Sequence, residues 1–151
     1  MRIVIQKVKK ASVVVEGKKI SSINIGLLVL VGIENNDTHD DIEYLVKKTT
    51  QLRVFNDENG VMNLSVKDVG GDIIVVSQFT LHASTKKGNR PSYIRAAKPD
   101  FSIPMYEKFI DKMESAFGKN IGAGEFGATM DVTLINDGPV TIIIDSKQKD
   151  F

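Results

Sequence analysis

The chain has 151 residues, a formal net charge of +1 and 42% hydrophobic residues, a composition typical of one soluble globular domain over residues 1–151. It contains no cysteine, which excludes disulfides, thiolate zinc sites and a cysteine nucleophile. The longest apolar runs, such as IGLLVLVGI at 25–33, are far shorter than the roughly 20 residues of a membrane helix, and the charged, strand-like start does not resemble a signal peptide. We therefore expect a cytoplasmic protein without a membrane partner.

The first third of the chain predicts strands followed by a helix. Short apolar segments with glycine between them predict an antiparallel run of strands at residues 2–8, 11–17, 18–26 and 27–33. The last of these is apolar on both faces and predicts a central, fully covered strand. Apolar residues then recur at helical spacing and predict an amphipathic helix over about 39–51. Its N-cap is expected among Asn36, Asp37 and Thr38.

The rest of the chain predicts further strands and a second helix. Asn59-Gly60 is a strong hairpin signal, and DIIVVSQF at 72–79 predicts a buried strand. Pro99 and Pro104 flank the start of a helix that ends near Gly118. Two last strands, 128–136 and 139–145, are expected around the Asp-Gly-Pro of residues 137–139. The whole pattern predicts a strand-rich α/β domain with two covering helices.

Two features that suggest cofactors fail their context tests. GAGEFG at 122–127 matches the dinucleotide fingerprint, but it follows a helix and precedes a strand, so the phosphate would not meet a helix N-terminus. A connector with glycines at positive φ is the better interpretation. His39 and His82 are the only histidines and show no metal-ligand spacing, so we expect neither a metal nor a cofactor.

The hydroxyl-rich segment after the buried strand has two interpretations. Thr80 and His82 would point the same way if the strand continued, which would suit a nucleophile and its base. No carboxylate is near in sequence to orient the base, and no G-x-S-x-G elbow is present. Hydroxyls that satisfy loop backbone groups are therefore favoured over a triad. The acid-free basic segment that follows, residues 86–98, is either a solvated loop or a phosphate-facing patch.

Two separated motifs together carry a family resemblance. SQFTL at 77–81 and NDGPVT at 136–141 resemble the paired signature of the D-aminoacyl-tRNA deacylase family. MRIVIQKV at 1–8, KKGNRPSYIRAAKP at 86–99 and GEFGATMDVTLINDGPVT at 124–141 are also similar, so the resemblance covers essentially the whole chain. Lys7 stands where the family pattern has arginine, which keeps a cation but loses the planar guanidinium.

The resemblance implies an enzyme that hydrolyses the ester bond of D-aminoacyl-tRNA, and of tRNA mischarged with glycine, and releases free tRNA and the amino acid. This reaction is a chiral proofreading step of translation, and it rejects L-aminoacyl-tRNA. The implied fold is a three-layer α/β/β domain with barrel-like sheets and two covering helices, and the implied assembly is a homodimer. Backbone N–H groups of the catalytic segment would stabilise the oxyanion, while the 2′-hydroxyl of the terminal adenosine would help activate water. That segment comprises Ser77, Gln78, Phe79 and Thr80.

The resemblance also implies two further groups of site residues. Gly138 and Pro139, joined by a cis peptide bond, would enter the partner subunit's site and leave no room for an L side chain. Lys86, Lys87 and Arg90 would contact tRNA phosphates, which position the substrate without reading its sequence. A serine or threonine esterase for small esters and a non-catalytic RNA-binding module are the alternatives. A requirement for tRNA separates the first from the deacylase, and turnover separates the second.

Overall fold

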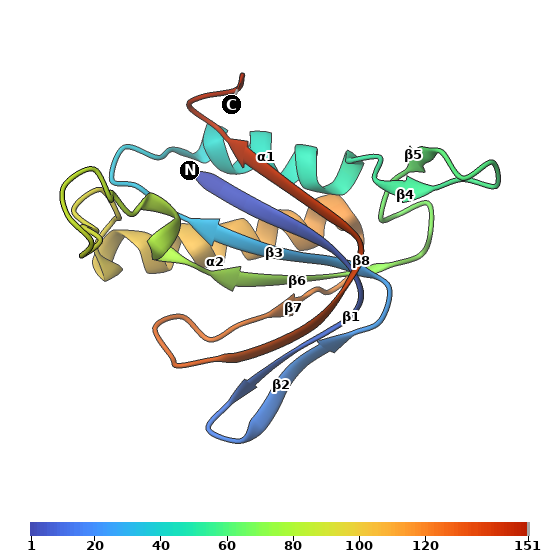
Figure 1. Ribbon diagram of the computed structural model, residues 1–151, viewed down its shortest axis with the longest axis horizontal. Coiled ribbons are helices and arrows are strands. Elements are labelled where there is room, and N and C mark those ends of the chain that lie inside the picture. The colour runs from blue at the N-terminus through green and yellow to red at the C-terminus, as the bar shows by residue number, and fades with distance from the viewer. Residues whose placement is uncertain (151) are drawn as a thin grey trace.

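The computed structural model describes residues 1–150, which form a six-stranded sheet covered on one face by two helices (Figure 1). The order along the sheet is β2-β1-β3-β6-β7, and β8 pairs with the other edge of β1. β6 runs parallel to β3 and β7, whereas the pairs made by β1 are antiparallel. The strands are Arg2–Val15 (β1), Lys18–Ile23 (β2), Gly26–Gly32 (β3), Asp72–Ser77 (β6), Gly122–Ala123 (β7) and Asp131–Asp145 (β8).

Two long strands replace the pairs of short strands that the sequence predicts. Residues 2–8 and 11–15 belong to the single strand β1, and the two strands expected around Asp-Gly-Pro are one strand, β8. β8 pairs with β1 from Arg2↔Asp145 to Val14↔Asp131, so the prediction of a turn between two strands was wrong. A proline lacks the N–H that a ladder needs. Here the interruption is absorbed as an irregular register between Gln6 and Lys10, and the chain does not reverse.

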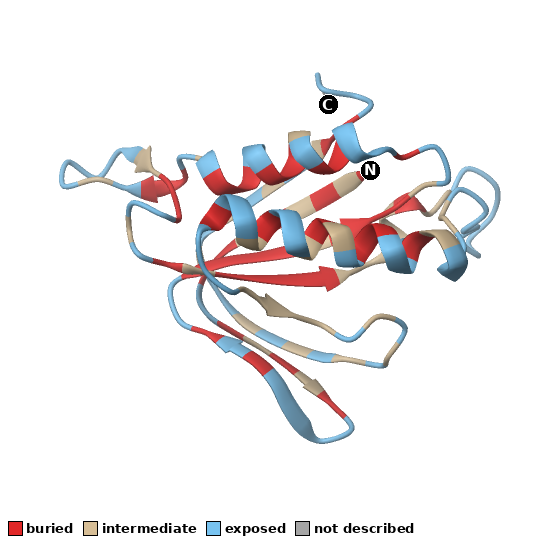
Figure 2. Ribbon diagram, turned by 180° about the vertical axis from the view of Figure 1, so that it is seen from behind, coloured by how far each residue is buried: buried red, intermediate tan, exposed pale blue. Residues whose placement is uncertain are grey.

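The two helices begin and end where local signals predict. α1 spans His39–Gln51 and has Thr38 as its N-cap, whose backbone N–H donates to the Asp41 carboxylate (2.7 Å). α2 spans Pro99–Phe117 and ends at Gly118, which takes a left-handed conformation (φ 87°). Figure 2 shows both helices with buried residues toward the sheet and exposed residues outward. Neither these helices nor any other helix within residues 1–150 is long and apolar enough to cross a membrane.

Alternating side chains of the central strands separate two cores. On β3, Leu27, Val29 and Val31 face the helices and pack with α1 and α2. Leu28 faces the other way and packs with residues of β2 and of the first half of β8, which curl beneath the sheet. The predicted three-layer α/β/β arrangement with a barrel-like sheet is therefore confirmed, and β3 is buried on both faces as expected.

Two local elements lie at opposite ends of the sheet. The hairpin of β4 (Phe55–Asn56) and β5 (Met62–Leu64) encloses Gly60, as the Asn-Gly signal predicts. At the other end, the predicted strand 72–79 was too long, because β6 stops at Ser77 and the 3₁₀ helix η1 (Phe79–His82) follows. η1 packs so closely onto Gly32 that a Cβ there would lie 3.0 Å from the Cβ of Leu81 and from Cδ2 of His82.

Candidate active site

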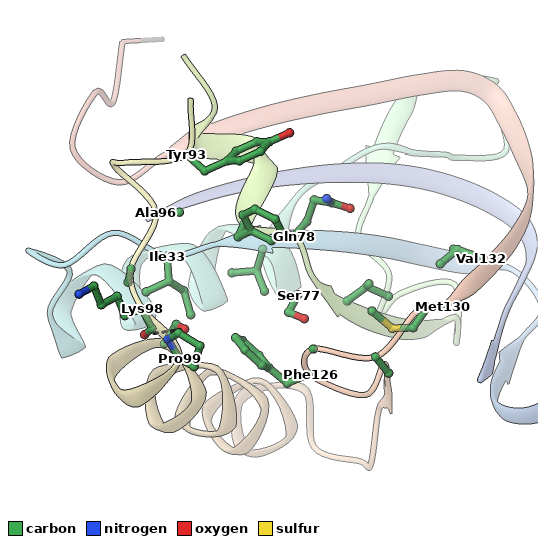
Figure 3. Close-up of a pocket in the computed structure, with 17 residues that line it drawn as sticks. Ile33, Ser77, Gln78, Tyr93, Ala96, Lys98, Pro99, Phe126, Met130 and Val132 are labelled. Carbon is green, nitrogen blue, oxygen red and sulfur yellow. Dashed lines mark hydrogen bonds between the residues drawn. The ribbon is translucent and has the colours of Figure 1, made fainter. Parts of the chain in front are cut away.

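A cavity of about 620 Å³ opens beside the C-terminal ends of β3 and β6 (Figure 3). Its walls come from segments far apart in sequence: two central strands, the start of η1, the basic segment, the first turn of α2 and the chain that leads into β8. The lining is mostly apolar, with Ile33, Val76, Phe126 and Met130 among its residues. A largely apolar cleft with a few polar groups is the usual form of a small-molecule site.

The Ser77–Thr80 segment forms the polar edge of this cavity. Ser77, Gln78 and Phe79 line it, whereas Thr80 does not. The Gln78 N–H donates to the carbonyl of Val31 (2.7 Å), which attaches the start of the turn to β3. The next two N–H groups, of Phe79 and Thr80, begin η1, and a helix leaves its first N–H groups without an intrahelical acceptor. The turn therefore places two backbone donors at the end of β6.

The structure does not assemble Thr80 and His82 as a nucleophile and base. In a 3₁₀ helix, side chains two positions apart point to different sides, unlike those on a strand. His82 is only 1% exposed, and its Nδ1 lies 3.0 Å from Oε1 of Glu34, outside hydrogen-bond geometry. The Thr80 hydroxyl instead accepts a short hydrogen bond from the Gln78 side-chain amide. The amide nitrogen donates this bond and is not a base, so the contact does not activate Thr80.

Titratable groups are scarce around the cavity. Of the residues that line it, all within the described part of the chain, only Lys98 and Tyr93 are titratable. Tyr106 lies behind the wall, where its hydroxyl donates to the carbonyl of Val75 (3.0 Å) and its ring packs on Phe126. Burial raises the pKa of Tyr106 to about 12, so it is neutral at physiological pH. The lining therefore offers no carboxylate or imidazole as a general base.

Several lining residues were not predicted from the sequence. Phe126 and Gly127 belong to GAGEFG, which the sequence assigned only to a connector. In that segment Gly127 has positive φ (78°), whereas Gly122 belongs to β7, so the expected connector is in part a strand. Tyr93 and Lys98 lie in the basic segment, whose charge is visible in the sequence but whose place in the cavity wall is not. The glycine-rich pattern of GAGEFG was the one sequence signal that could have drawn attention to Phe126 and Gly127.

The basic segment leaves its predicted phosphate ligands in solvent. Lys86, Lys87 and Arg90 are exposed, and within residues 1–150 none of the three forms an ion pair. Reciprocal hydrogen bonds between the backbones of Ser84 and Ser92 (2.8 and 2.9 Å) close the loop that carries them. The same segment continues into the cavity wall at Tyr93 and Lys98.

Gly138 and Pro139 lie away from the cavity of their own chain. Their peptide bond is cis, both residues are exposed, and Gly138 has φ +133°. Lys7, at the arginine position of the family pattern, is buried with its Nζ 3.3 Å from Oδ2 of Asp137. Strand register places residues 137–140 opposite Lys7, and Lys7 opposite Leu27, while Ser77 pairs with Val31.

The register also gives the separation between the two motifs. Four residues along the strands and three steps across the sheet put Gly138 about 20 Å from Ser77 in one chain. Figure 1 agrees, since the middle of β8 lies at the end of the sheet opposite the tips of β3 and β6. One chain by itself therefore does not bring SQFTL and NDGPVT together.

Comparisons with known proteins show the family to which the chain is related. The chain matches the family model for D-Tyr-tRNA(Tyr) deacylase over residues 4–145. Proteins named D-aminoacyl-tRNA deacylase from Flavobacterium johnsoniae and Bacteroides thetaiotaomicron are 65% and 60% identical over 150 residues, covering 99% of this chain and 100% of each relative. A solved c-Myc DNA unwinding element binding protein aligns with a TM-score of 0.91 at 41% identity, covering 96% of this chain and 98% of that one. A solved probable eukaryotic D-amino acid tRNA deacylase, at 16% identity, has a TM-score of 0.81 over 95% and 97% of the two chains and shows the fold alone.

Proposed function

Because this chain belongs to the D-aminoacyl-tRNA deacylase family, we propose that it hydrolyses the ester of D-aminoacyl-tRNA in the cavity beside Ser77–Thr80. The products are free tRNA and a D-amino acid, and the reaction is a proofreading step of translation in the cytoplasm. The observation that carries the mechanism is a cavity lined by Phe79, whose backbone N–H begins η1, and by no carboxylate or imidazole. Such a site stabilises an oxyanion but leaves the activation of water to the substrate.

The substrate's 2′-hydroxyl supplies this second function. Water attacks the ester carbonyl carbon, and the N–H group of Phe79, next to that of Thr80, stabilises the negative oxygen that forms. The ester carbon–oxygen bond then breaks, and the 3′-oxygen of the ribose leaves with a proton that the attacking water has lost. The adjacent 2′-hydroxyl helps to transfer that proton. Thr80 has no nucleophilic role, since its hydroxyl is bonded to Gln78 and does not line the cavity.

Selection against L-aminoacyl-tRNA requires a second copy of the chain. Gly138 and Pro139 of one protomer enter the cavity of its partner, where their backbone carbonyls hold the substrate's α-amino group. Their exposure and their distance of about 20 Å from Ser77 of the same chain support this arrangement. An L side chain would collide with the inserted backbone, whereas a D side chain would point outward. Glycine has no side chain to collide, so glycyl-tRNA is also cleaved.

The basic segment positions the tRNA. Lys86, Lys87 and Arg90 are exposed cations of the segment that continues into the cavity wall, and they contact phosphates of the acceptor end. Because these contacts read no bases, the enzyme accepts many tRNAs.

Release of amino acid from D-Tyr-tRNA, L-Tyr-tRNA and Gly-tRNA tests this function directly. We expect rapid release from the first and the third and negligible release from the second. A D-Tyr-tRNA with the ester on O3′ and hydrogen in place of the 2′-hydroxyl should be nearly inert. Rapid hydrolysis of D-tyrosine methyl ester would instead indicate a small-ester esterase, and binding without turnover would indicate an RNA-binding module.

A further inference from the structure

Two exposed aromatic rings stand at the edge of the cavity. Phe79 is 54% exposed and Tyr93 is 41% exposed, although both line the cavity. Their ring centroids are 5.0 Å apart with an interplanar angle of 72°, so they form an edge-to-face pair. Figure 3 shows Tyr93 at one edge of the group of lining side chains. The pair presents an apolar surface to solvent at the edge of the cavity.

The backbone on both sides holds Tyr93 in place. Ser92, immediately before it, is paired with Ser84 by two hydrogen bonds. After it, the Ala96 N–H donates to the Tyr93 carbonyl (3.0 Å), and the Ala97 N–H donates to Ile33 of the cavity wall (2.9 Å). The backbone that carries the ring is therefore held in place before any ligand binds, which lowers the entropy lost on binding.

The charges around the pair select the kind of ligand. The stretch 84–98 contains no acidic residue and carries five cations: Lys86, Lys87, Arg90, Arg95 and Lys98. All five are exposed. Exposed aromatic rings beside a basic track are the features with which proteins bind single-stranded nucleic acid, because bases stack on the rings while cations follow the phosphates.

We propose that Phe79 and Tyr93 form a stacking platform for the nucleotide that precedes the terminal adenosine of the substrate. This inference rests on the proposed function, because the terminal aminoacyl nucleoside must occupy the cavity for the preceding base to reach its edge. Stacking tolerates every base, so the platform adds affinity for the single-stranded end without discriminating among tRNAs. The basic segment then meets the phosphates on the same side.

The first test compares substrates with and without the preceding nucleotides. Tyr93→Ala should raise KM for D-Tyr-tRNA by about five- to 150-fold, the range for losing one base stack, with little change in kcat. The same variant should cleave 3′-(D-tyrosyl)adenosine with wild-type KM. Tyr93→Phe, which keeps the ring, should restore KM for the tRNA substrate. Ile94→Ala, which alters the 85% exposed neighbour of Tyr93, is the matched control and should leave KM unchanged for both substrates.

A second test does not require catalysis. Calorimetry should show that the wild-type protein binds the uncharged trinucleotide CCA more tightly than adenosine, and that Tyr93→Ala reduces this difference while leaving the affinity for adenosine unchanged. Equal affinities in the wild type would overturn the platform, as would an equal loss on both substrates, which would place Tyr93 at the terminal nucleoside. An unchanged KM for tRNA would overturn it as well. Failure of the wild type to cleave D-Tyr-tRNA would instead refute the proposed function, and the calorimetry would still decide the platform.

Discussion

Replacing Gly138 with alanine tests the proposed gate most directly. Gly138 has φ +133°, which side chains with a Cβ rarely adopt, and an added Cβ would lie 2.8 Å from both Cγ2 and the backbone N of Val140. Holding alanine in this conformation costs about 1–3 kcal/mol, so the backbone shifts instead or the protein loses that much stability. A shift of about 1 Å in a positioning group can reduce a rate about 100-fold. We therefore expect kcat/KM for D-Tyr-tRNA to fall by about that factor.

Gly17→Ala provides a matched control. Gly17 also has positive φ (76°), but its added Cβ would meet nothing within 4 Å, and it lies in the turn between β1 and β2. We expect a loss of about 1–2 kcal/mol in the free energy of unfolding, measured in urea, with kcat/KM unchanged. The comparison separates the cost of the backbone conformation from an effect on the site.

Mixing subunits shows in which chain the gate acts. Ala96→Trp should fill the cavity, because Ala96 lines it, and should inactivate the site of its own chain. Random pairing of equal amounts of Gly138→Ala and Ala96→Trp subunits makes about half of the dimers mixed, and each mixed dimer has one of its two sites intact. The mixture should therefore have about one quarter of the wild-type activity. No recovery on mixing would refute the cross-subunit gate. Wild-type kcat/KM in Gly138→Ala would refute any role for Gly138.

Three other predictions concern chemistry, binding and stability. Thr80→Ala should retain deacylation within about tenfold in initial-rate assays, since a neutral hydrogen bond contributes about 0.5–1.5 kcal/mol, and a fall to background with the fold intact would make Thr80 the nucleophile. Replacing Lys86, Lys87 and Arg90 with glutamine should lower the slope of log K for tRNA binding against log salt concentration by about 2, at roughly 0.7–0.9 per phosphate contact. An unchanged slope would mean that the segment is a solvated loop. Burial alone would raise the pKa of Asp41, but hydrogen bonds from Lys147 and Thr38 hold this pKa well below its usual 3.8. The ionised Asp41 therefore stabilises the folded state above pH 3.8, and this contribution is lost as the pH falls through the lowered pKa. Asp41→Asn should therefore reduce the acid-side dependence of unfolding free energy measured in urea from pH 2 to 7, and an unchanged dependence would contradict the reasoning.

Features set by neighbouring residues could be predicted from the sequence alone. The apolar spacing of α1 and α2, an N-cap for α1 within residues 36–38, the end of α2 at Gly118 and the turn at Gly60 each depend on contacts within a few residues. The double-sided apolar pattern likewise marked β3 as the covered central strand. The paired motifs led to the family for the same reason, since their residues can be read without knowing where they lie.

Features that depend on distant contacts were decided only by the tertiary structure. β8 is one strand because β1, more than 100 residues earlier, continues as its partner past Pro139. His82 is buried beside Glu34, and not beside Thr80, because η1 closes onto Gly32. The cavity brings Tyr93, Phe126 and Ser77 together from segments that no local pattern connects. Local propensity depends on the nearest residues, whereas strand pairing and burial lower the free energy only after the chain has folded back on itself, so the site exists only at that level.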